Sequence, residues 1–140
     1  MSDARAELQE YHQLCAYTLS HADRRFIHQH VVDAFAAQRA TASTKPIALA
    51  FALIGLYLHV ERYQTGKQVQ RAHMLLARHR KSVPRFELPD TRGEITVMDV
   101  MRLAAGPQRD AMIDTWCASV WEAYRACHDQ VAELVRTELD

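Results

Sequence analysis

The sequence predicts an all-α fold, a single-domain helical bundle of about five helices with a central apolar helix. Long stretches place apolar residues at the 3.6-residue period of an α-helix, and no segment alternates apolar and polar residues for long enough to indicate a sheet. Glycine and proline, which interrupt helices, number only four each in 140 residues. Because 140 residues is the usual length of one domain and 49% are hydrophobic, residues 1–140 are expected to share one core.

The first predicted helix runs from about Asp3 to Leu19 and carries the first candidate histidine. Its apolar stripe has the i, i+3, i+4, i+7 spacing of one helix face and consists of Leu8, Tyr11, His12, Cys15 and Leu19. His12 and Cys15 are therefore expected to point inward.

The second predicted helix, residues 24–39, follows Asp23 as its N-cap. Its apolar stripe consists of Ile27, Val31, Ala34, Phe35 and, as an exception, Gln38. Successive residues of a helix advance by about 100°, so His28 and His30 lie about 200° apart and flank this stripe on opposite sides. The two histidines are therefore expected to do different jobs, unless the first turn is distorted.

The third predicted helix, residues 46–61, begins at a proline and is apolar all round. A helix without a polar face is normally covered by the others, so this one is expected to be central. Its apolar run from Ile47 to Leu58 has twelve residues, and a membrane span needs roughly twenty.

The fourth predicted helix, residues 67–80, places His73 in the middle of its apolar face. An irregular excursion over about 82–106 follows, within which Thr96 is expected to cap a short helix over 97–104. A last long helix opens after this excursion, at Gly106-Pro107, and is expected to break near Cys127.

Composition excludes several classes of function. Seventeen Lys and Arg balance seventeen Asp and Glu, so nucleic acid and anionic membranes are not expected partners. The polar N-terminus has no secretory pattern and predicts a cytoplasmic protein. Three cysteines without CxxC spacing predict reduced thiols. There is no glycine-rich phosphate loop and no GxSxG or HExxH motif, which disfavours those enzyme classes.

Eight histidines is a high count for this length, and several of them fall on apolar helix faces. His12, His59 and His73 are expected to be at least partly buried. Helices that supply one or two ligands each can assemble a site for zinc, nickel or iron, which needs three or four N, O or S ligands. The predicted metal ligands are His12, His30 and His73.

Other polar residues complete the predicted centre. His28 and Asp33 are the candidate catalytic residues, as a base or as partners of a ligand. Gln38 and Gln70 are candidates for orienting ligands or a cofactor. The alternative for each is structural: a hydrogen-bonded core histidine, or a glutamine that bridges two helices.

Several strings of the sequence resemble a known family. They are Tyr11-His12, Phe26-Ile27-His28-Gln29-His30-Val31-Val32-Asp33-Ala34, Lys45-Pro46-Ile47, Ala52 to Leu58, and Gln68-Val69-Gln70-Arg71-Ala72-His73-Met74. The chain resembles, over about residues 10–125, a group of small bacterial helical proteins that form a domain of unknown function. The resemblance implies no activity, but it favours His12, His28, His30, Asp33, Gln70 and His73, and His59 departs from its pattern.

Two functions follow as hypotheses. The first is a metal-dependent enzyme, hydrolytic or transferase-like, with an open coordination position for water. The second is a non-catalytic module whose histidine cluster recognises a small ligand or a partner protein. A purely structural role stays possible, and so does assembly of the chain into a homo-oligomer.

Overall fold

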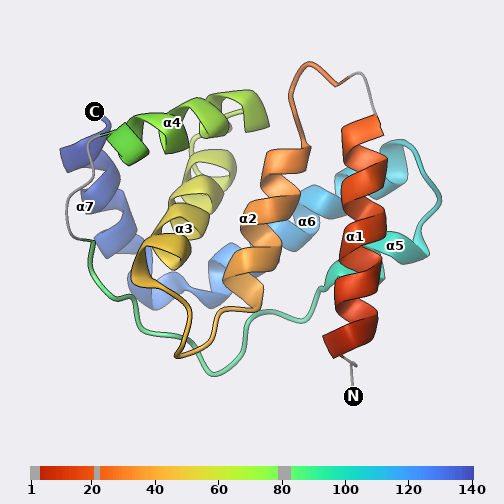
Figure 1. Ribbon diagram of the computed structural model, residues 1–140, viewed down its shortest axis with the longest axis horizontal. Coiled ribbons are helices and arrows are strands. Elements are labelled where there is room, and N and C mark those ends of the chain that lie inside the picture. Colours follow the sequence, from red (N-terminus) through yellow and green to blue (C-terminus); the bar gives the residue numbers. More distant parts are fainter. Residues whose placement is uncertain (1–3, 21–22, 79–82) are drawn as a thin grey trace.

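The computed structural model describes residues 4–20, 23–78 and 83–140. Over these residues the chain forms helices and no strands, as predicted (Figure 1). The helices are α1 (Ala4–Ser20), α2 (His28–Gln38), α3 (Pro46–Val60), α4 (Gly66–Arg78), α5 (Val97–Arg102), α6 (Pro107–Ala123), a 3₁₀ turn at Arg125–Cys127 and α7 (His128–Glu138). The predicted ends at Asp3 and Arg80, and the start of the excursion at residue 82, lie outside the described residues.

The described part of the chain has seven α-helices where about five were expected, because the short predicted helix over 97–104 forms as α5 and the last predicted helix is divided in two. The division falls at Tyr124, close to the predicted break near Cys127. The Tyr124 hydroxyl donates a hydrogen bond to the carbonyl of Ala37 at 2.6 Å, which fixes this residue in the core. The break then allows α7 to pack against α3 through Val131 and Val135, both fully buried.

The apolar helix α3 packs against α2, α4, α6 and α7 (Figure 1). The expectation that it is covered on every side is not met in full, because Phe51 and Tyr57 are half-buried and Ala48 is exposed. Helix α2 shares the central position, since it packs against α1, α3, α4 and α6. The amphipathic α4 packs on the outside of α2 and α3 and holds His73 against α3.

Helix α1 presents a different face from the one predicted. Its fully buried residues are Leu14 and Thr18, and with half-buried Tyr11 and Cys15 they form an i, i+3, i+4, i+7 stripe. This rotation leaves Leu19 59% exposed and places His12 on the exposed side. The predicted inward position of His12 is therefore wrong.

The start of α2 also differs from the prediction. The Asp23 carboxylate accepts hydrogen bonds from the backbone amides of Arg25 (2.9 Å) and Ile27 (2.8 Å), so it stabilises a turn before the helix. Phe26 has a φ of 59° within this turn, and α2 begins at His28, four residues later than predicted. The other local predictions are closer: α3 starts at Pro46, and Thr96 and Asp99 form the capping box of α5.

None of the helices in the described ranges is both long enough and apolar enough to cross a membrane.

Candidate functional site

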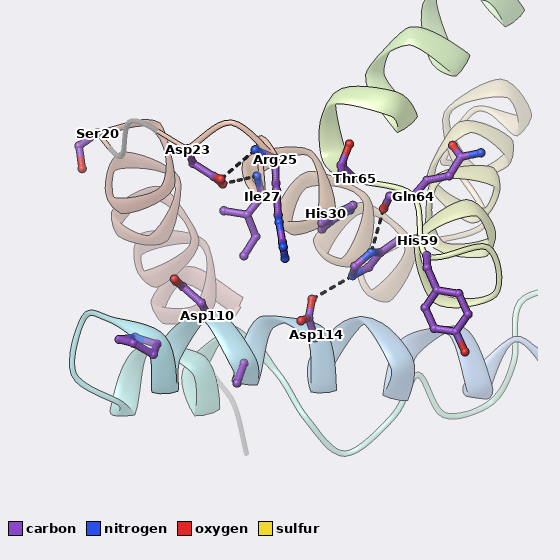
Figure 2. Close-up of a pocket in the computed structure, with 13 residues that line it drawn as sticks. Ser20, Asp23, Arg25, Ile27, His30, His59, Gln64, Thr65, Asp110 and Asp114 are labelled. Carbon is purple, nitrogen blue, oxygen red and sulfur yellow. Dashed lines mark hydrogen bonds and ion pairs between the residues drawn. The ribbon is translucent and has the colours of Figure 1, made fainter.

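A polar cleft of about 1240 Å³ lies between the start of α2, the connection from α3 to α4, and α6 (Figure 2). Three parts of the chain line it: Ser20, Asp23, Arg25, Ile27 and His30; His59, Tyr63, Gln64 and Thr65; and Pro107, Asp110, Ala111 and Asp114. Pockets for small molecules usually measure about 300–1,000 Å³, so the space is large enough for one.

Two stacked imidazoles form the inner wall of this cleft. The rings of His30 and His59 lie 3.5 Å apart between centroids, with 15° between their planes. His30 is 4% exposed, and within the described structure its Nδ1 is buried without a hydrogen-bond partner. Burial, reinforced by the neighbouring His59, lowers the pKa of His30 to about 3, so this ring is neutral at physiological pH.

His59 is held between two acceptors. Its Nε2 lies 3.0 Å from a carboxylate oxygen of Asp114, and its Nδ1 lies 3.3 Å from the backbone carbonyl of Gln64 (Figure 2). An imidazole that is oriented by a carboxylate and lines a cleft is a common arrangement in acid–base sites.

The rim of the cleft has an unusual backbone. The non-glycine residues with positive φ in the described structure are Phe26, at 59°, and Tyr63, at 56°. Both lie in segments that line the cleft, and Lys67 joins these segments by donating its backbone N–H to the carbonyl of Arg25 at 3.0 Å. A side chain at Gly66 would overlap the carbonyl of Phe26, so only glycine allows this approach. Strained backbone of this kind is concentrated at functional sites.

Asp33 belongs to a second network, which lies between α2, α3 and α4. Its Oδ1 accepts a hydrogen bond from Gln29 Nε2 at 3.2 Å, and that same nitrogen lies 3.4 Å from His73 Nδ1. His73 Nε2 donates to the carbonyl of Phe51 at 2.8 Å, so Nδ1 is free to accept from Gln29. Burial lowers the pKa of His73, which favours this neutral form.

The carboxyl group of Asp33 is 3% exposed and packs directly on Gly55, where an added Cβ would overlap it. Its Oδ2 is buried without a partner among the described residues, and burial raises its pKa well above the ordinary value. His30 and Asp33 are i, i+3 neighbours, but they contact different parts of the protein. His30 lines the cleft, and Asp33 packs on α3.

The structure does not bring the three predicted metal ligands together. His12 is exposed on α1, His30 stacks on His59, and His73 lies between α4 and α3. Within residues 4–20, 23–78 and 83–140, no group of three or more His, Cys, Asp and Glu side chains is placed to hold a metal ion.

The other candidates have mostly structural partners. His28 Nδ1 lies 2.9 Å from the hydroxyl of Thr18, and burial lowers its pKa. The Gln38 side chain bridges three segments: it donates to the carbonyls of Arg92 (3.1 Å) and Ile95 (2.7 Å) and accepts from Trp116 Nε1 (2.9 Å). Gln70 is half-buried on α4. Gln38 therefore bridges α2 to α6 and to the segment before α5, which is the structural alternative given for this residue above.

A family model described as a family of unknown function (DUF5946) matches residues 8–125 of this chain. The chain belongs to this family. The matched region contains every residue that lines the cleft and ends before α7. Neither a curated protein nor a solved structure shows significant similarity to the chain.

The sequence analysis did not identify the carboxylates that line the cleft. Asp110 and Asp114 lie on α6 at i, i+4 spacing, and this signal was available because residues four apart share a helix face. The pairing of Asp114 with His59 could not be predicted, since 55 residues separate the two in the sequence.

Proposed function

We propose that the protein binds a small polar molecule in the cleft between α2, the α3–α4 connection and α6. The observation that carries this proposal is the His30–His59 stack, a pair of imidazoles at the wall of an open cleft with one nitrogen left unpartnered. Buried polar groups are nearly always hydrogen-bonded, so an unpartnered nitrogen at the wall of a cleft calls for an explanation such as a bound molecule.

Two further features support a binding role. The backbone at Phe26 and Tyr63, beside the cleft, has positive φ, and strained backbone of this kind is concentrated at functional sites. The hydrogen-bonded imidazole of His59 and carboxylate of Asp114 line the same cleft, so a bound molecule would meet groups of the kind used in acid–base chemistry.

A ligand screen by thermal unfolding tests this proposal. A ligand present at about 100 times its Kd stabilises a folded protein by about 2.7 kcal/mol, which is a shift of several degrees in Tm for a domain of this size. We expect compounds that raise Tm in the wild-type protein to lose this effect in His59→Gln.

His12→Gln is the matched control, because His12 is exposed outside the cleft. Each variant is compared with its own unliganded Tm, so a change in basal stability does not confuse the result. Equal ligand-induced shifts in His59→Gln and the wild type would refute the cleft as the binding site.

The predicted metal stays a prediction with its own test. Of its predicted ligands His12, His30 and His73, His30 is the one that lines the cleft, and its neutral ring is the type of donor that zinc, nickel and iron accept. Elemental analysis of protein purified without a metal-affinity tag supports the metal-dependent enzyme if near one equivalent is found and His30→Ala removes it. A metal content that stays far below one equivalent after addition of each ion rejects it.

A further inference from the structure

We infer that the cleft takes an organic cation, a small molecule that carries an amine or a quaternary ammonium group. This inference rests on the proposed binding function and concerns the class of ligand.

The cleft offers acceptors. Asp23, Asp110 and Asp114 all line it, and each carboxylate keeps lone pairs beyond the bonds it makes in the protein. Asp110 accepts one hydrogen bond from the hydroxyl of Tyr17 at 2.7 Å, and Asp114, with its side chain 61% exposed, is paired with His59 alone among the described contacts. Asp110 and Asp114 lie one helical turn apart on α6 and both line the cleft, so two carboxylates are available to a ligand there.

The backbone donors that an anion would need are already used. The N–H groups of Arg25 and Ile27 donate to Asp23, the N–H of Gln64 donates to the carbonyl of Leu58, and that of Thr65 donates to the side chain of Gln68. A helix start or turn binds an anion through free N–H groups, and the N–H groups named above already donate hydrogen bonds within the protein. Of the described residues that line the cleft, Arg25 is the one Lys or Arg, whereas three carry carboxylates.

The rim adds an aromatic face. Tyr63 lines the cleft and is 87% exposed, so its ring is accessible to a ligand. Cations bind to the faces of tyrosine rings, and aromatic side chains recognise quaternary ammonium groups in this way.

The experiment is a titration of ¹⁵N-labelled full-length protein with four probes at constant ionic strength: tetramethylammonium chloride, putrescine, sodium acetate and glycerol. Amide chemical shifts report where each probe binds. We expect tetramethylammonium and putrescine to shift the amides of Arg25, Gln64 and Asp114, and acetate and glycerol to leave them unchanged.

Matched variants separate charge from shape. Asp110→Asn and Asp114→Asn keep an acceptor for Tyr17 and His59, and each is expected to weaken binding of the cations by about two- to five-fold, as expected for one partly exposed charge pair. Arg25→Gln removes the competing cation and is expected to strengthen binding. Asp129→Asn, an exposed carboxylate on α7 outside the cleft, is expected to leave affinity unchanged.

Tyr63 has its own control. Tyr63→Phe keeps the aromatic face and is expected to retain affinity, whereas Tyr63→Ala is expected to lose about two- to five-fold.

The outcomes distinguish the inference from the proposed function. Binding of acetate or glycerol at the cleft, without binding of the cations, overturns the cation inference and retains a binding cleft. Cation binding that Asp110→Asn and Asp114→Asn leave unchanged also overturns it. A thermal screen without any ligand for the cleft would remove the proposed function itself.

Discussion

Replacing Asp33 with asparagine is expected to stabilise the protein, and by an amount that grows with pH. The Asp33 carboxyl is 3% exposed, packs on Gly55 and accepts one hydrogen bond, from Gln29. Burial raises its pKa well above 3.8, so the folded chain holds a proton that the unfolded chain releases. The wild-type stability linked to this group is therefore complete below pH 3.8 and is lost as the pH rises toward the folded pKa.

The magnitude follows from proton linkage. Between the unfolded and the folded pKa, each pH unit removes about 1.4 kcal/mol of wild-type stability, and asparagine removes this dependence because it does not titrate. Over two pH units within that interval the variant should gain about 3 kcal/mol relative to the wild type. Asparagine also keeps the oxygen that accepts from Gln29, so the packing on Gly55 changes little.

Urea denaturation of both proteins at a series of pH values above the ordinary carboxyl pKa measures this difference. The comparison with the wild type is needed because His28, His30 and His73, whose pKa values are lowered, make stability rise with pH in both proteins. Asp129→Asn, which replaces an exposed carboxylate, should show no such pH-dependent gain. A difference between Asp33→Asn and wild type that stays constant with pH would show that Asp33 is ionised in the folded chain and refute the reasoning.

Three further substitutions test other contacts. His30→Phe keeps a ring on His59, and because the folded pKa of His30 is about 3, its stability relative to the wild type should increase as the pH falls below the ordinary value of 6.5, measured by urea denaturation. Gly55→Ala, although favourable for an isolated helix, should cost about 1–3 kcal/mol because its Cβ overlaps the Asp33 carboxyl; an increase in Tm would contradict this contact. Gln38→Leu should cost about 1–3 kcal/mol since it leaves the buried Trp116 N–H unpaired, and an unchanged denaturation midpoint would show that the bridge contributes nothing.

The fold was largely predictable from helical periodicity and local capping signals. Pro46 opens α3, and Thr96 with Asp99 caps α5, because each of these signals acts within one turn of the helix that it starts. The face of α1 was not predictable, because apolar residues lie on both of its sides and the packing of α2 and α5 decides that Leu14 is buried and Leu19 is exposed.

The candidate site was predictable only in part. His30 stands out as a histidine beside an apolar stripe, and it does line the cleft. The prediction combined it with His12 and His73, since periodicity gives the inward face of each helix but not which inward faces meet. His59, which interrupts an apolar helix, and Asp114 are the residues that meet it, and only the packing of α3 on α6 brings them there.

The central claim, that the cleft binds a small polar molecule, is tested most directly by mapping amide chemical shifts during titration with the compound that gives the largest thermal stabilisation. The account predicts saturable shifts concentrated in the three segments that line the cleft, at residues 23–30, 59–65 and 107–114. Shifts confined to other surfaces, such as the outer face of α4 around Met74 and Leu75, with the cleft amides unchanged, would contradict it.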